Sequence, residues 1–122
     1  MVILDANVIL RYLLNDNQEM AERADHLIQT EDVSVTIEVM AEVIYVLKGV
    51  YKVDRERIAD TLLEFLHLVM CENMEVLRLA LETFKKNNLD FVDCVLYSWH
   101  KIKNAEIATF DKKLLKLIES TE

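Results

Sequence analysis

The chain has 122 residues and a formal net charge of −8, with 14 Lys and Arg side chains against 22 Asp and Glu. Hydrophobic residues make up 52% of the chain and charged residues 30%, a balance that excludes a disordered chain and predicts a single domain over residues 1–122. One glycine and no proline exclude collagen-like and turn-rich all-β architectures. They also exclude the P-loop and the dinucleotide-binding loop, which need several glycines.

Short runs suited to β-strands alternate with longer stretches of helical spacing. We expect a three-layer α/β/α sandwich with a short central parallel sheet, because parallel strands need helical crossovers between them. In chain order, the predicted elements are strand 2–4, helices 6–14 and 18–29, strand 33–35, helices 37–48 and 54–66, strand 68–71, helices 74–86 and 91–103, strand 107–108 and helix 112–118.

The sequence carries no signal for a membrane or a zinc site. A membrane-spanning helix needs about 18 or more consecutive apolar residues, and no such run is present. Asp5 and Arg11 interrupt the only apolar stretch near the N-terminus that could resemble a signal peptide. The two cysteines, Cys71 and Cys94, lack a zinc motif and are expected to be reduced, small apolar side chains. We therefore expect a cytoplasmic protein without a membrane partner.

Two acidic residues directly follow predicted strands. Asp5 comes after strand 2–4, and Asp111 comes soon after strand 107–108. In open α/β sheets, ligands bind in the crevice at the carboxyl ends of the strands. Each carboxylate can equally cap the helix that follows it, which is the simpler interpretation of either residue alone.

Two further acids lie in strongly apolar helices. Glu42 belongs to helix 37–48, which is apolar over most of its circumference; it either shares a narrow solvent stripe with Glu38 or points into a cleft. Asp93 lies in the first turn of helix 91–103, where the helix dipole also favours a negative charge. Four carboxylates confined together would need a cation or protons to offset their repulsion. Oxygen-only ligands favour Mg²⁺ or Mn²⁺, and the implied chemistry is phosphodiester hydrolysis.

Four motifs in order resemble those of the PIN-domain nucleases, and most closely those of the VapC-type toxins of type II toxin–antitoxin pairs. The resemblance covers essentially the whole chain and implies a single-strand-specific endoribonuclease that depends on Mg²⁺ or Mn²⁺. It also implies a cognate antitoxin as partner and a homodimer. The motifs are Val-Ile-Leu-Asp5-Ala-Asn7, Ala-Glu42-Val-Ile-Tyr, Asp90-Phe-Val-Asp93-Cys and Ala-Thr109-Phe-Asp111-Lys.

Carried over residue by residue, the resemblance assigns a role to each position. It implies that Asp5, Asp93 and Asp111 bind the metal ion, and that Glu42 binds it or orients a water molecule. Asn7 and Thr109 match polar residues that support the ligands, and Asp90 is expected to cap its helix. Ala6 departs from the pattern, since many members have Thr or Ser there.

The excess of acidic residues is unusual for a protein that binds nucleic acid, because Lys and Arg supply most of the affinity for phosphate. The region from Lys101 to Lys116 is locally basic and adjoins Asp111. Its lysines either contact RNA or decorate solvated helix ends, where the helix dipole favours them. The candidate RNA-contacting residues are Arg11, Lys101, Lys103, Lys112 and Lys113.

Two alternatives to the toxin remain. One is a housekeeping RNA-processing nuclease without an antitoxin, which the presence of a neighbouring small open reading frame would distinguish. The other is a catalytically silent scaffold of the same fold that binds RNA or protein. A binding module has no need to confine like charges, so the presence of all four acids argues against the scaffold.

Overall fold

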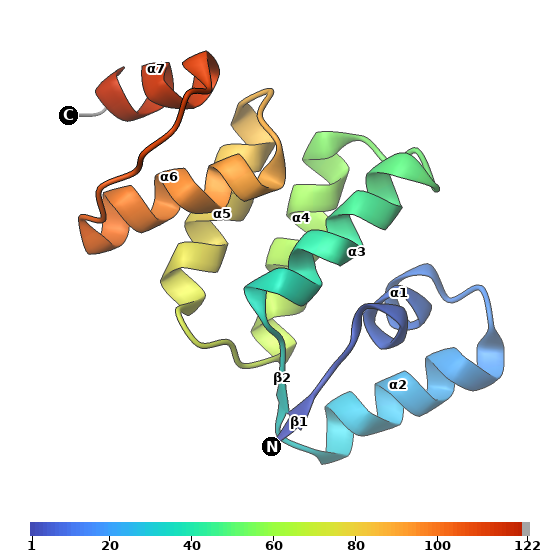
Figure 1. Ribbon diagram of the computed structural model, residues 1–122. Helices are drawn as coiled ribbons and strands as arrows, with labels where there is room; N and C mark the ends of the chain where they lie inside the picture. The colour runs from blue at the N-terminus through green and yellow to red at the C-terminus, as the bar shows by residue number, and fades with distance from the viewer. Residues whose placement is uncertain (121–122) are drawn as a thin grey trace.

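The computed structural model describes residues 1–120. Within them, short parallel strands are embedded among helices, and Figure 1 shows their arrangement. The elements follow in the order β1 (Val2–Ile3), α1 (Ala6–Leu14), α2 (Gln18–Thr30), β2 (Val33–Ser34), α3 (Ile37–Gly49), α4 (Arg55–Phe65), the 3-10 turn η1 (Leu66–Leu68), α5 (Met74–Lys86), α6 (Phe91–Lys103) and α7 (Lys112–Ser120).

The sheet is short and parallel. Val2 lies opposite Val33 and Ile3 lies opposite Ser34, so β1 and β2 pair in register over two residues. Met70 adds a single parallel bridge to Ser34, and its N–H donates to the Val33 carbonyl at 2.9 Å. The predicted strand 68–71 is therefore reduced to one bridging residue beside β2.

The predicted strand at residues 107–108 is wrong. Residues 104–111 form no regular element and lead from α6 to α7, away from the sheet (Figure 1). Ile107 instead packs with Tyr97 of α6 and with Leu114 of α7 in a small second apolar cluster. The packing of Ile107 against these helices outweighs its β-propensity. No fourth strand therefore extends the sheet at residues 107–108.

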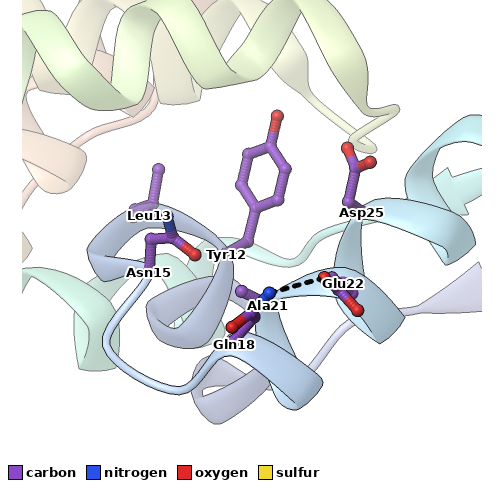
Figure 2. Close-up of a pocket in the computed structure, with 7 residues that line it drawn as sticks. All are labelled: Tyr12, Leu13, Asn15, Gln18, Ala21, Glu22 and Asp25. Atoms are coloured by element: carbon purple, nitrogen blue, oxygen red, sulfur yellow. Dashed lines mark hydrogen bonds between the residues drawn. The ribbon is translucent and has the colours of Figure 1, made fainter.

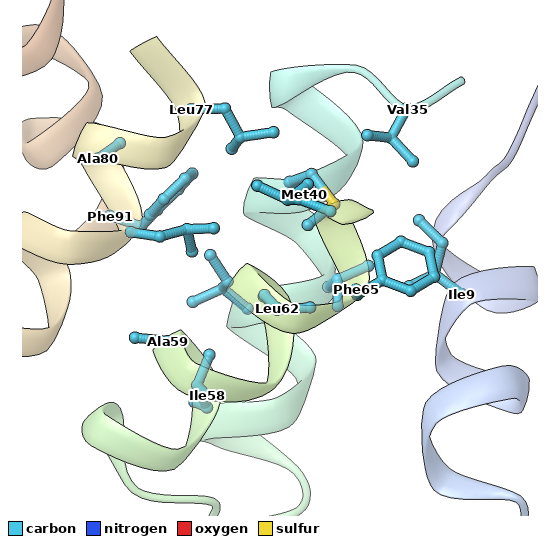
Figure 3. Close-up of a cluster of buried hydrophobic side chains, with 14 of the residues drawn as sticks. Ile9, Val35, Met40, Ile58, Ala59, Leu62, Phe65, Leu77, Ala80 and Phe91 are labelled. Atoms are coloured by element: carbon cyan, nitrogen blue, oxygen red, sulfur yellow. The ribbon is translucent and has the colours of Figure 1, made fainter. Parts of the chain in front are cut away.

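The α/β/α fold class is confirmed, although helices dominate it. Helices α1 and α2 lie on one side of the strands and α3 to α6 on the other, with α7 beyond α6 (Figure 1). The main core joins the two helical layers. Figure 3 shows Ile9 of α1 facing Phe65 of α4, next to the group around Met40 and Leu62. Ile9, Met40 and Leu62 are fully buried.

Polar residues begin and end the helices in a chain that has one glycine and no proline. Asn15 and Asn104 adopt left-handed conformations at the ends of α1 and α6, with φ of 51° and 56°. Asn17, Thr36 and Asp54 accept hydrogen bonds from main-chain N–H groups at the starts of α2, α3 and α4. Because these stop and start signals are local, the predicted helix bounds agree with the structure to within one or two residues.

None of the helices in residues 1–120 combines the length and the apolar character that crossing a membrane requires. Cys71 and Cys94 form no disulfide with each other. Cys94 is fully buried in α6, and burial raises the pKa of its thiol to about 12, which makes it an inert apolar side chain.

Candidate functional site beside the start of α6

Two carboxylates, Asp90 and Asp93, lie at the start of α6 on either side of the buried Phe91 in the sequence. Phe91 is 5% exposed and packs edge-on against Phe84 of α5, with ring centroids 6.0 Å apart. This contact seats the helix and leaves Asp90 and Asp93 nearer to solvent. Asp90 occupies the N-cap position as predicted, but its side chain makes no capping hydrogen bond.

Arg55 at the start of α4 holds the turn that precedes α6. Its Nη1 donates to the carbonyl oxygens of Phe84 at 3.0 Å and Leu89 at 2.7 Å. Its guanidinium carbon also lies 3.9 Å from the centroid of the Phe84 ring, a cation–π contact. Sequence reasoning missed Arg55, because its partners are main-chain carbonyls distant in the sequence and leave no motif.

A pocket of about 480 Å³ lies between α3 and α6, next to these carboxylates. Its rim includes two apolar side chains in water, Tyr45 and Val92, which are 77% and 58% exposed. Lys48 stands on the same side, with its Nζ 5.9 Å from the centroid of the Phe84 ring. The pocket is lined by Ala41, Ile44, Tyr45, Lys48, Phe84, Asp90, Phe91, Val92 and Asp93.

The structure raises the pKa of the Asp93 carboxyl above its ordinary value. Partial burial raises the pKa of its side chain, and the negative charges of Asp111 and Asp90 raise it further. Asp111 is therefore near enough to Asp93 for its charge to act on this carboxyl. A cation between them would reverse this effect, because it favours the ionised form of both acids.

Asp111 is held by hydrogen bonds on both sides. Its Oδ1 accepts from the N–H of Leu114 at 3.0 Å and so caps α7, and its own N–H donates to Thr109 Oγ1 at 3.0 Å. Thr109 thus orients the backbone at Asp111, which fits a supporting role. The cap uses one carboxylate oxygen, and a carboxylate has a second oxygen that can bind a cation.

Asp5 forms the equivalent cap at the start of α1. Its Oδ1 accepts from the N–H of Val8 at 3.0 Å, and the side chain is exposed. The helix-cap interpretation is therefore correct for both Asp5 and Asp111. Nearby Asn7 is exposed and lines a separate small pocket with Arg11.

The four candidate acids do not form one cluster. Among residues 1–120, no three His, Cys, Asp or Glu side chains lie close enough together to hold a metal ion. Glu42 is exposed on α3, and neither Glu42 nor Asp5 completes a group of three with Asp93 and Asp111. Residues 107–108 form no strand, so Asp111 does not follow a strand of the sheet as Asp5 follows β1.

The pair of Asp93 and Asp111 nevertheless has suitable chemistry for Mg²⁺. This ion keeps several waters and is commonly bound through one or two carboxylates together with substrate phosphates. The pair supplies only hard oxygen donors. The pKa of Asp93 is raised first by burial and then by repulsion from Asp111 and Asp90, and a cation would relieve the repulsion. The residues present therefore fit a divalent metal ion, with two of the four acids already in range of each other.

Two of the five candidate RNA-contacting residues already have acidic partners. Arg11 Nη1 pairs with Asp16 at 2.9 Å, and Lys103 Nζ pairs with Glu75 at 3.0 Å. To contact a phosphate, these side chains must exchange a carboxylate for it. The three other candidates are exposed lysines: Lys101, Lys112 and Lys113.

The structure is thus a small α/β/α domain in which two acids, Asp90 and Asp93, lie at the start of α6 and line an open pocket. The chain belongs to the PIN domain family, whose sequence pattern matches residues 2–119. PIN domains are generally metal-dependent nucleases. No significant match to the chain is found among curated proteins or solved structures.

Proposed function

We propose that this protein is a Mg²⁺- or Mn²⁺-dependent endoribonuclease that hydrolyses phosphodiester bonds of single-stranded RNA. The observation that carries the proposal is the position of Asp93. It is half-buried at the edge of a pocket, and its pKa is raised by this burial and, to a lesser extent, by the charge of Asp111. Perturbed carboxylates in a pocket are candidates for functional groups, and membership of a nuclease family gives this one a reaction.

Asp93 and Asp111 are proposed to bind the ion through their carboxylate oxygens, with Asp5 as the third ligand. A bound Mg²⁺ or Mn²⁺ supplies a water of lowered pKa and neutralises charge on the phosphate. Glu42 is proposed to orient the attacking water. For all four acids to act together, Asp5 and Glu42 have to approach the pair formed by Asp93 and Asp111.

Cleavage of a mixed pool of structured RNA tests this proposal. We expect the purified protein to cut the RNA with Mg²⁺ or Mn²⁺, to stop when EDTA is added, and to be inactive as the Asp5→Asn variant. Asparagine caps a helix as well as aspartate does, so the variant keeps the start of α1 while losing the charge. Cleavage that persists in EDTA or in Asp5→Asn would contradict the proposed site.

The toxin role is proposed from a groove beside α1, which is separate from the pocket that Asp93 lines. Two adjoining pockets, of about 720 and 410 Å³, share Tyr12 and Leu13. Figure 2 shows the Tyr12 ring rising from α1 between Leu13 and Asp25, and this ring packs against Phe65 of α4, with ring centroids 5.8 Å apart. The floor includes Tyr12, Leu13, Phe65 and Leu68, and the rims carry Glu22, Asp25 and Glu64.

An apolar floor between acidic rims fits a basic amphipathic helix, and we propose such a segment of a cognate antitoxin as the occupant. The expected result is that the product of a small open reading frame beside the gene copurifies with this chain and inhibits its cleavage. Leu68→Asp, at a residue 45% exposed in the groove, should abolish inhibition and leave cleavage unchanged. Inhibition that Leu68→Asp does not weaken would exclude this groove.

The oligomeric state and the alternatives have distinct signatures. A homodimer is proposed from the family resemblance, and its mass in solution tests it directly. A housekeeping nuclease would cleave RNA with no neighbouring inhibitor gene. A silent scaffold would bind RNA or protein and show no cleavage with any divalent metal.

A further inference from the structure

Two exposed aromatic side chains lie near the acids Asp93 and Asp111, one beside each. Tyr45 on α3 is 77% exposed and lines the pocket that Asp93 also lines. Phe110 is fully exposed and immediately precedes Asp111. Neither ring is used by the core, so folding does not account for placing these two large apolar surfaces in water next to charges.

The pocket between α3 and α6 offers a base-sized apolar surface next to a cation. Tyr45 and Lys48 are three residues apart on α3, so their side chains are neighbours on the helix surface. Val92 of α6, 58% exposed, forms part of the apolar lining, and its neighbour Asp93 adds the carboxylate. At about 480 Å³, the pocket falls in the range of small-molecule sites, roughly 300 to 1,000 Å³.

We propose that this pocket binds one unpaired nucleotide of the RNA strand, and that Tyr45 and Phe110 position the strand across the acid pair. The base stacks on the Tyr45 ring, Lys48 contacts the adjoining phosphate, and a second base stacks on Phe110. The inference rests on the proposed nuclease function and deepens it, since it names the residues that select the substrate.

Stacking on exposed rings explains a preference for single strands. A base in a duplex has its faces covered by its neighbours, whereas an unpaired base offers its face to an aromatic side chain. Bases and phosphates alternate along a single RNA strand. Tyr45 and Lys48 offer an aromatic ring for a base and, next to it, a cation for the adjoining phosphate. The same alternation recurs at the other end, where Phe110 is followed by exposed Lys112 and Lys113.

Lys48 beside Tyr45, and exposed Lys112 and Lys113 after Phe110, favour RNA over an apolar protein segment, because these cations can bind its phosphates. An apolar segment docking on the two rings would instead desolvate the neighbouring carboxylates of Asp90, Asp93 and Asp111 without pairing them. A phosphate backbone can reach the same acids through a divalent ion and Lys48 directly. A bound protein or a second copy of this chain is therefore an alternative outcome of the test.

The test measures binding without cleavage, in the Asp5→Asn protein with Mg²⁺. The probes are a labelled single-stranded octaribonucleotide and an abasic strand of the same length and charge, followed by fluorescence anisotropy. Tyr45→Ala and Phe110→Ala should each weaken binding of the octamer roughly tenfold or more and leave the abasic strand unaffected. Tyr45→Phe keeps the ring and should bind as the parent does. Lys48→Gln should weaken both probes, because it removes a phosphate contact.

Matched controls separate this effect from general surface changes. Val50→Ala removes an apolar side chain that is 66% exposed just past α3, and Lys86→Gln removes an exposed lysine at the end of α5; both should bind as the parent does. Equal loss of the octamer and the abasic strand in Tyr45→Ala would overturn the inference, as would no binding of the octamer. A changed oligomeric state in Tyr45→Ala would assign the surface to a second copy instead. Undiminished RNA cleavage by Tyr45→Ala with Phe110→Ala would overturn the inference while the nuclease function stands.

Discussion

Asp93→Asn is expected to abolish metal-dependent RNA cleavage while raising the melting temperature of the metal-free protein. The side chain keeps its shape but loses the charge that a divalent cation needs, so turnover should fall by orders of magnitude. Stability should rise because the Asp93 carboxylate is partly buried and repelled by Asp111 and Asp90, and an amide relieves both effects.

The raised pKa of Asp93 also determines how the unfolding free energy depends on pH. The pKa of Asp93 is raised in the folded protein, so the folded state holds its proton more tightly than the unfolded state does. Stability therefore falls as the pH rises from the ordinary Asp pKa, about 4, through the raised value, and the penalty is complete above it. The wild type and Asp93→Asn should melt alike at low pH and separate by a few degrees at neutral pH.

Asp90→Asn is the matched control, because it removes a charge three residues away without removing a proposed ligand. It should retain cleavage, since the Asp90 side chain makes no capping hydrogen bond and lies outside the proposed metal set. Melting curves across a pH series and cleavage assays with Mg²⁺ measure both effects. Loss of cleavage in Asp90→Asn together with activity in Asp93→Asn would exchange the roles of the two acids.

Phe84→Ala is expected to cost about 3–5 kcal/mol of unfolding free energy, in the range for removing a buried aromatic ring. The ring is 1% exposed and meets Phe91 at 6.0 Å and the Arg55 guanidinium carbon at 3.9 Å. Its removal leaves a cavity under the pocket and takes away the surface on which Arg55 stacks. The melting temperature should fall by roughly 10 °C or more. Cleavage should fall too, because Phe91 at the start of α6 loses the ring against which it packs.

Phe110→Ala controls for the truncation itself. The same atoms are removed from a ring that is fully exposed, so the unfolding free energy should change by less than about 0.5 kcal/mol. Urea unfolding of the two variants beside the wild type makes the comparison. Similar losses from both substitutions would mean that Phe110 is buried in solution, for example in an interface.

The sequence predicts the helices of this protein well, because helical spacing and capping residues are local signals. Asn17 and Asp54 mark the starts of two helices in the sequence and accept the expected hydrogen bonds in the structure. The strands are less predictable, because a short apolar run becomes a strand only where another strand pairs with it. Ile107 has β-propensity but finds apolar partners on α6 and α7.

The candidate site divides in the same way. The sequence by itself determined the family, the carboxylates and their place at strand and helix ends, because side-chain chemistry and local backbone signals lie within a few residues of each other. Only the tertiary structure decided which acids meet, bringing Asp93 into range of Asp111 but not into a group of three with Asp5 or Glu42. It also decided that Arg55 braces α6 and that Tyr45 faces water beside a pocket. These features depend on packing between segments far apart in the chain, and burial and charge at a site arise only when such segments are brought together.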